Sequence, residues 1–309
     1  MPRTVDISVP SERAPGLIAQ VKDMDGVIAV RHFPGASVKE PGDLISLEIL
    51  DTRLHGLVRL LQSAGIGRDA GTTIVTNSPV SVVAPQLIER VARDDTECTW
   101  EEMESAMARE SNMTANGVTV MAVAGVVAVM GIATGAVHVV VGAMLIAPGF
   151  EPLTRIGLGI VAQSRAWQRG LKDAAIAYAT LLLSAIAAAA VLRLAGQPLL
   201  TGDTYLPAAS LVTYWSTVTF PSIASSVVAA VGGAVLVAAG RALLTGGVMI
   251  ALALVPTLSL FGMALVAGEW QLAGQAAIRW IIEVALVLVL STAVMLWKRN
   301  RVHQRPSMM

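Results

Sequence analysis

The longest stretch of this chain without a charged residue runs from Ser111 to Phe150, between Glu110 and Glu151. A transmembrane helix needs about 20 mainly apolar residues, so this stretch is long enough for two crossings. The composition agrees, because 54% of the 309 residues are hydrophobic and the mean hydropathy is +0.66. Such values are typical of a membrane protein rather than of a soluble domain.

The charged residues divide the chain into parts. The sequence predicts a cytoplasmic domain over 1–84, an amphipathic connecting helix or linker over 85–112 that is interrupted near Asp94, a transmembrane domain over 113–298, and a basic cytoplasmic tail over 299–309. The formal net charge is zero, so the chain has no excess of positive charge that would favour binding to nucleic acid. The single cysteine, Cys98, excludes an intrachain disulfide and a cysteine-based metal site of the usual kind.

The first part has the pattern of a small α+β domain. Helices are expected after Ser11-Glu12-Arg13, which can cap the first of them, and over 54–64; strands are expected over 4–9, 27–33, 44–50 and 72–76. The order βαββαβ is that of a ferredoxin-like fold. It resembles small regulatory domains of the ACT type, and this similarity implies self-association and a small-molecule effector.

Six segments of the second part are apolar and long enough to cross a membrane. The positive-inside rule places Arg165, Arg169, Lys172 and the basic residues after Trp297 in the cytoplasm. Both termini are therefore expected on the cytoplasmic side, in agreement with the lack of a secretory signal at the start. The loop over 195–222 is expected to form an external cap or amphipathic excursion. The six candidates are 116–134, 137–162, 174–194, 223–239, 243–266 and 278–297.

A short motif occurs twice in this region. GAMLIAPGFEP (142–152) aligns with GGVMIALALVP (246–256) at an offset of 104 residues, with identities at both ends and in the middle. The same offset superposes the first three candidate helices on the last three without a gap. Because three crossings reverse the chain direction, the two halves would form the inverted three-plus-three repeat found in many secondary transporters. The predicted fold class is therefore a six-helix membrane bundle with an inverted repeat, preceded by the ferredoxin-like domain.

The prolines in the motif predict a broken helix. Each proline disfavours helix in the residue before it, so Ala147 and Glu151 are expected to be extended. Irregular backbone at membrane depth is tolerated where it lines a cavity or is buried in protein. Transporters place their substrate or ion sites at such points. The candidate substrate or ion-binding residues are Pro148, Gly149, Glu151, Pro152, Arg155, Pro256, Thr257 and Ser259.

The roles of the polar residues stay open at this point. Glu151 and Arg155 stand at i and i+4, which permits an internal ion pair; alternatively Glu151 binds a cation or proton, or Arg155 an anion. Thr257 and Ser259 either satisfy carbonyls freed by the break or line the site. Glu283 is expected to form an ion pair with Arg279 at the outer rim of the last helix, or else to act in gating.

At these residues the chain resembles the domain of unknown function 389 family of bacterial membrane proteins. The resemblance rests on Val141-Gly-Ala-Met-Leu-Ile-Ala-Pro148 and on Gly247-Val-Met-Ile-Ala-Leu-Ala-Leu-Val-Pro256. It implies a protein of the bacterial plasma membrane and names no substrate. This chain departs from the usual family pattern by having carboxylates at Glu151 and Glu283.

The expected function is that of a transporter or channel for a small solute or ion, with a cytoplasmic regulatory domain and a homo-oligomeric assembly in the lipid bilayer. The alternative is a membrane-anchored oligomeric sensor or assembly scaffold without transport activity. No zinc-binding helix pattern, serine-histidine pair or paired carboxylates within one span occur, so the sequence predicts no enzyme, no catalytic residue, no metal and no cofactor.

Overall fold

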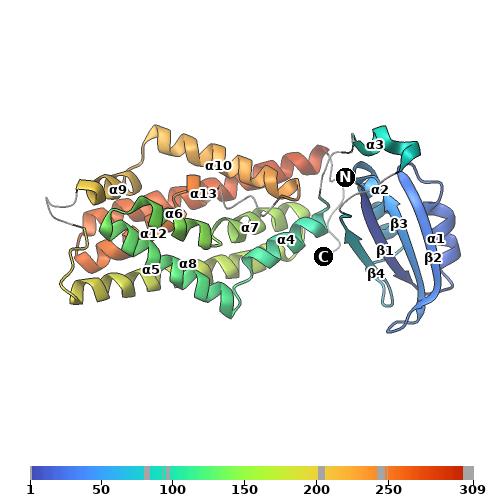
Figure 1. Ribbon diagram of the computed structural model, residues 1–309, viewed down its shortest axis with the longest axis horizontal. Helices are drawn as coiled ribbons and strands as arrows, with labels where there is room; N and C mark the ends of the chain where they lie inside the picture. Colours follow the sequence, from blue (N-terminus) through green and yellow to red (C-terminus); the bar gives the residue numbers. More distant parts are fainter. Residues whose placement is uncertain are drawn as a thin grey trace. The chain divides into compact units, whose positions relative to one another are not determined.

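The structure is a computed structural model, shown in Figure 1. It describes residues 2–79, 84–92, 94, 98–200, 206–241, 248 and 250–301. The chain separates into two compact units, of which the second spans Glu102–Asn300.

The first unit contains a four-stranded antiparallel sheet. Its strand order is β2-β3-β1-β4, so the two central strands are β3 and β1. The sheet and its two helices follow the order βαββαβ, as the sequence predicted. The elements are β1 (Arg3–Val9), α1 (Ala14–Val21), β2 (Val27–Ser37), β3 (Gly42–Ile49), α2 (Asp51–Ser63) and β4 (Thr73–Asn77).

The core of this unit lies between one face of the sheet and the two helices. Along β1 and β3, buried and partly buried residues alternate with the period of a strand. Ile7 of β1 stands opposite Ile45 of β3 and Ile74 of β4, and this register aligns the apolar side chains on one face. The core is completed from the helices by Leu17, Val21, Leu54, Leu57 and Leu61.

The predicted cap of the first helix is wrong. No side chain caps α1, and the Ser11 hydroxyl donates instead to Asp43 Oδ1 at 2.6 Å. Asp43 also accepts from the Gly35 amide at 3.0 Å and lies 2.6 Å from His32 Nε2. The carboxylate thus holds together the segment after β1 and the hairpin between β2 and β3.

The contacts of Asp43 predict an acid-sensitive contribution to stability. The hydrogen bond from Ser11, followed by those from Gly35 and His32, lowers the pKa of Asp43 from 3.8 to about 2. Since the folded state prefers the carboxylate, this contribution is complete above about pH 4 and is lost as the pH falls toward 2. Asp43→Asn should therefore make this unit easier to unfold at pH 4, and the difference from the unmodified protein should shrink toward pH 2.

Pepsin cleavage of the full chain in detergent between pH 2 and pH 4.5 measures this difference, because pepsin is active throughout that range. Asp23→Asn serves as the control, since the Asp23 side chain is 81% exposed and lies 3.9 Å from Lys22. An Asp43→Asn effect that stays constant with pH would contradict the prediction.

The connecting region contains short helices rather than one continuous helix. A 3₁₀ turn, η1 (Pro85–Leu87), leads into α3 (Ile88–Ala92), and α4 covers Trp100–Ser111. The predicted interruption near Asp94 is confirmed, because Asp94 is not helical. Its carboxylate accepts hydrogen bonds from the Asp51 and Thr52 amides at the start of α2.

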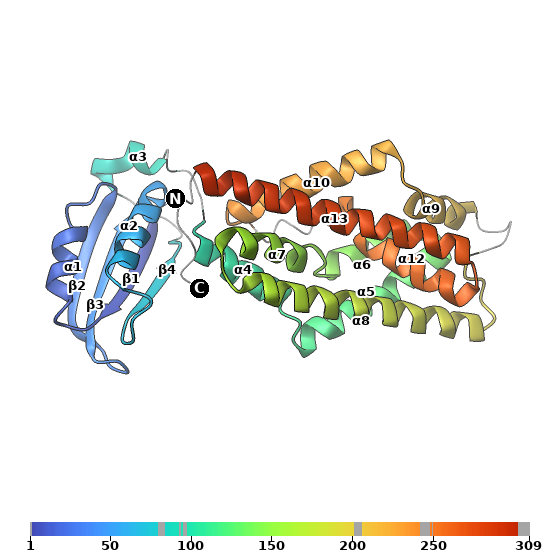
Figure 2. The same cartoon turned by 180° about the vertical axis from the view of Figure 1, so that it is seen from behind.

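The second unit is helical. Among the described residues, five helical segments are long and apolar enough to cross a membrane; one of them, Val137–Ala162, is divided into two helices by a break, and α12 is a shorter apolar helix. These features indicate a membrane protein. In both Figure 1 and Figure 2 the long helices run roughly along one axis, and α10 lies beside α13. The helices are α5 (Ala115–Thr134), α6 (Val137–Ile146), α7 (Phe150–Ala162), α8 (Ala166–Leu194), α9 (Leu206–Ser216), α10 (Phe220–Ala238), α12 (Leu254–Ala267) and α13 (Trp270–Arg301).

The predicted spans match these helices with differences at their ends. The third and sixth begin eight residues earlier than expected, at Ala166 and Trp270, because their polar first turns are also helical. Within the predicted fifth span, 243–247 and 249 lie outside the described residues, and α12 covers its second half. The predicted excursion over 195–222 contains α9.

Small residues allow close packing in this unit. A Cβ atom built on Gly159 of α7 would lie only 2.2 Å from the Trp167 backbone nitrogen, and one on Gly125 of α5 would lie 2.6 Å from the Leu181 carbonyl oxygen. The helix backbones approach too closely at these points for any side chain.

Candidate functional site

The first helix break lies at Ala147 to Gly149. Ala147 has an extended backbone (φ −76°, ψ 120°), as expected for a residue before proline, and α7 begins at Phe150. The Tyr178 hydroxyl of α8 donates to the Gly149 carbonyl at 2.8 Å. A side chain from a neighbouring helix therefore satisfies a carbonyl group inside the break, as irregular backbone within a membrane requires. The predicted break at Pro148 is confirmed.

Glu151 is helical, so its predicted extended conformation is wrong. It is the second residue of α7, and Pro152 is the third. Proline is tolerated in the first turn of a helix, where the missing amide hydrogen has no intrahelical acceptor. Pro152 therefore helps α7 to start instead of interrupting it. Both residues are buried.

A second break precedes α12. Leu252 and Ala253 are not helical, and Pro256 is the third residue of α12, the position that Pro152 has in α7. The Thr257 hydroxyl donates to the carbonyl of Ala253 and lies 3.3 Å from that of Leu254. Thr257 thus satisfies backbone groups at the break, which is the first of the two roles that the sequence left open. Ser259 is fully buried, and its hydroxyl has no hydrogen-bond partner among the described residues.

The two broken helices approach each other at α10. A Cβ atom built on Gly233 would lie 2.6 Å from Cζ of Phe150, the first residue of α7, and 3.0 Å from Cγ1 of Val248, which precedes the second break. Side chains next to both breaks therefore pack against the same glycine of α10.

Arg155 forms its ion pair with Asp173 of α8 at 3.0 Å. Its guanidinium also donates to the Ser111 hydroxyl and to Asn112 Oδ1, at 3.1 and 2.8 Å. The expected partner Glu151 is therefore replaced by a carboxylate on another helix. The Arg155 side chain is only 3% exposed. It joins the half-helix α7 to the end of α4.

The other buried ion pair joins Arg279 and Glu283 on α13. Arg279 Nη2 lies 2.6 Å from Glu283 Oε1, and the two side chains are 2% and 0% exposed. The predicted pairing is confirmed, but the predicted rim position is wrong. Glu283 is thirteen residues after the start of α13 at Trp270, which is about 20 Å along the helix. The earlier helix start places the pair deep in the bundle.

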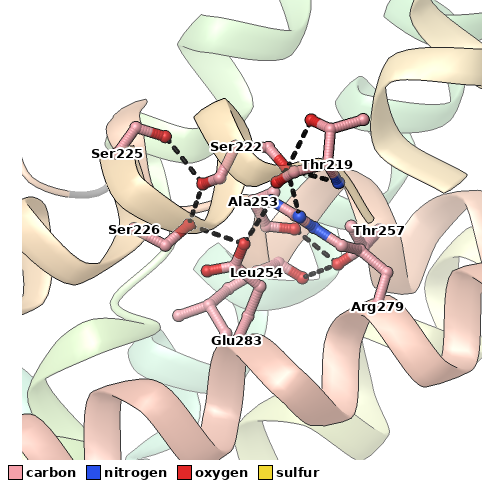
Figure 3. A network of polar contacts seen from close by, with 9 residues as sticks. All are labelled: Thr219, Ser222, Ser225, Ser226, Ala253, Leu254, Thr257, Arg279 and Glu283. Atoms are coloured by element: carbon pink, nitrogen blue, oxygen red, sulfur yellow. Dashed lines mark hydrogen bonds and ion pairs between the residues drawn. The ribbon is translucent and has the colours of Figure 1, made fainter. Parts of the chain in front are cut away.

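Two serines of α10 complete this cluster, as Figure 3 shows. Arg279 Nη1 donates to the Ser222 hydroxyl at 2.6 Å, and the Ser226 hydroxyl donates to Glu283 Oε1 at 2.7 Å. Ser222 is also tied to Thr219, the residue that precedes α10. The same view contains Thr257 with the start of α12. We call Ser222, Ser226, Arg279 and Glu283 the polar cluster.

The residues of the polar cluster are not among the substrate or ion-binding residues that the sequence predicts. A signal was present, because Ser222 and Ser226 stand at i and i+4 and so do Arg279 and Glu283. Equal spacing places each pair on one face of its helix. The spacing does not indicate that these two faces meet in the folded protein.

The polar cluster is only partly satisfied. Glu283 Oε2 and Arg279 Nε have no hydrogen-bond partner among the described residues. An ion pair away from water is costly unless its remaining polar atoms find partners. The free oxygen and nitrogen provide one acceptor and one donor for an ion, a water or a polar solute. Within the described part of the chain, no three His, Cys, Asp or Glu side chains are arranged to hold a metal ion.

Comparison with known families identifies this region. Residues 144–289 match the family described as "Domain of unknown function (DUF389)". The chain carries a DUF389 domain. No match was found among the curated proteins or among the solved structures. The DUF389 domain begins just before the first break and includes α12 and the whole polar cluster. The resemblance expected from the sequence is thus confirmed over this range, and the family description assigns no activity.

Proposed function

We propose that this protein moves a small solute or ion across a membrane, and that its pathway passes the polar cluster. The observation that carries the proposal is the Arg279–Glu283 pair, buried to 2% and 0% exposure within an apolar helix. Ionisable residues at such positions are rare and usually mark a substrate or ion pathway. The pair lies beside a helix whose first turn follows a break, and secondary transporters bind their substrates at such breaks.

The helix boundaries support an inverted repeat, which this proposal includes. Phe150 and Leu254, which begin α7 and α12, are 104 positions apart in the chain. The same separation relates Ala166 to Trp270, which begin α8 and α13. Each half would contain three crossings, so the second half runs in the opposite direction. The repeat would then bring the two breaks to equivalent depths from opposite sides.

The two halves differ in their chemistry. In the first half, positions 175 and 179 correspond to Arg279 and Glu283, and both are alanine. The charged pair therefore exists on one side of the repeat only. The two breaks are related by the repeat, but the charged pair lies at one of them only. We expect this asymmetry if the pathway binds its solute at a single place. In the proposal the termini are cytoplasmic, and the first unit is a regulatory domain that binds an effector and associates with its copies.

Flux into proteoliposomes tests the proposal. The full chain is reconstituted and flux is followed with pH-sensitive and potential-sensitive dyes across a panel of inorganic ions and small organic anions. Ser226→Ala removes one hydrogen bond to Glu283 without changing any charge. We expect it to change the flux of the transported species about tenfold, since a hydrogen bond to a charged group contributes about 1.5–3 kcal/mol.

Ser291→Ala is the matched control. Ser291 is likewise buried, on α13, and the only hydrogen bond of its hydroxyl among the described residues goes to the Leu288 carbonyl of its own helix, at 3.4 Å. Its substitution should leave the flux unchanged. Equal effects of the two substitutions would remove the polar cluster from the pathway. Absence of flux across the whole panel, with the protein folded and inserted, would favour the sensor or scaffold function instead.

A further inference from the structure

The second unit has an apolar groove that the proposed transport function does not use. Its volume is about 520 Å³, and its walls come from α7, α8, α12 and α13. Ile156, Leu171, Leu182, Phe261, Ile281 and Leu288 are among its lining residues. Leu171 is 55% and Ile281 58% exposed, so the groove is open along one side. In a membrane that side faces lipid.

The length of the groove matches one leaflet of a bilayer. On α8 it extends from Leu171 to Leu182, and on α13 from Ala277 to Leu288. Eleven residues of helix rise about 16 Å. The hydrocarbon core of a bilayer is about 30 Å thick, so each leaflet provides about 15 Å of acyl chain. One extended chain of a lipid therefore fits the groove from end to end.

The end of α8 at which the groove begins is basic. Arg165, Arg169 and Lys172 lie within six residues of Leu171 in the chain, and all three are exposed. The acidic residue among them, Asp173, is already paired with Arg155. Exposed Lys and Arg side chains beside an apolar membrane surface attract the anionic head groups of lipids.

We infer that this groove binds an anionic phospholipid, with one acyl chain between α8 and α13 and the phosphate at the basic start of α8. A second copy of the chain fits less well. A two-fold interface brings the same patch of both copies together, and here it would place the two basic ends near each other. A lipid phosphate neutralises this charge instead.

The bound chain would also contact a side chain that supports the helix break. Tyr178 and Trp280 line the groove and form an edge-to-face pair, with ring centroids 5.1 Å apart. The hydroxyl of the same Tyr178 donates to the Gly149 carbonyl in the first break. The lipid thus supports the side chain that satisfies this break.

Native mass spectrometry of the full chain in mild detergent tests the inference without any transport measurement. Phosphatidylglycerol and phosphatidylcholine with identical acyl chains are added separately, and bound lipid is counted per chain. The unmodified protein should bind phosphatidylglycerol more tightly. Lys172→Gln and Arg165→Gln should each weaken phosphatidylglycerol binding about fivefold, because each basic residue near the surface contributes about that factor. Arg241→Gln, which removes an exposed charge at the end of α10, should have no effect.

A second pair of variants tests the acyl-chain position. Ala175→Phe fills the groove from α8 and should reduce binding of both lipids, whereas Ala187→Phe adds the same bulk at an exposed position of α8 outside the lining residues. Equal binding of the two lipids, or equal effects of the two phenylalanines, would overturn the inference. So would a disulfide between two chains carrying Ile281→Cys in a Cys98→Ser background, because a second copy would then occupy the groove.

Discussion

Glu283→Gln is expected to lower the free energy of unfolding of the second unit by about 3–5 kcal/mol, the usual cost of breaking a buried ion pair by removing one partner. The Arg279 guanidinium would keep its hydrogen bond to Ser222. It would lose the Glu283 carboxylate, its ion-pair partner among the described residues. Unfolding of the full chain by sodium dodecyl sulfate, followed by circular dichroism of the helices, measures the loss.

The companion variants separate the cost of an unpaired charge from other effects. Arg279→Gln should be as harmful as Glu283→Gln, whereas the double substitution should recover most of the stability, since two amides leave no net charge. Double-mutant recovery of stability without recovery of flux would agree with a role of the pair in transport. If the two single losses add in the double variant, the two side chains do not act as a pair.

Arg155→Met is expected to cost about 3 kcal/mol and to loosen the junction between α4 and α5. The change removes three contacts at once and leaves the Asp173 carboxylate, which is 14% exposed, without its cation. Asp173 also accepts from the Met113 amide, so this amide should exchange faster with deuterium. Hydrogen exchange of the peptide that contains Met113, measured by mass spectrometry, tests this expectation.

Arg169→Met is the matched control, because Arg169 has the same side chain and is exposed in the first turns of α8. Arg155→Lys distinguishes charge from geometry. A lysine keeps the charge but lacks the planar fork that reaches several acceptors, so it should recover only part of the stability. Equal exchange of the Met113 peptide in all three variants would show that Arg155 does not hold this junction.

Much of the fold was predictable from local patterns. The alternation of apolar residues predicted the four strands, and the apolar stretches predicted the long helices, because burial follows a period of two in a strand and membrane crossing requires a minimum length. Pro148 predicted the first break through its steric effect on Ala147. The helix starts at Ala166 and Trp270 were missed, since their first turns are polar and have no apolar signal.

The candidate site was predicted only in part, because its residues come from different helices. The first break depends on Pro148, a neighbour in the chain, and was predicted correctly, whereas Glu151 was wrongly expected to be extended. Thr257 has one of the two roles that the sequence left open. The partner of Arg155 is a residue of α8, and the partners of Arg279 include a serine 57 positions away. No local pattern specifies such a pairing.

The sequence by itself determined that this chain has segments apolar and long enough to cross a membrane, that one of them is broken at Pro148, and which ionisable residues stand among apolar ones. These properties follow from hydrophobicity, from proline and from the cost of charge in lipid. Only the tertiary structure decided which charges meet. It paired Arg155 with Asp173 and surrounded Arg279 and Glu283 with serines of α10, because contacts between helices depend on their packing and not on spacing along the chain.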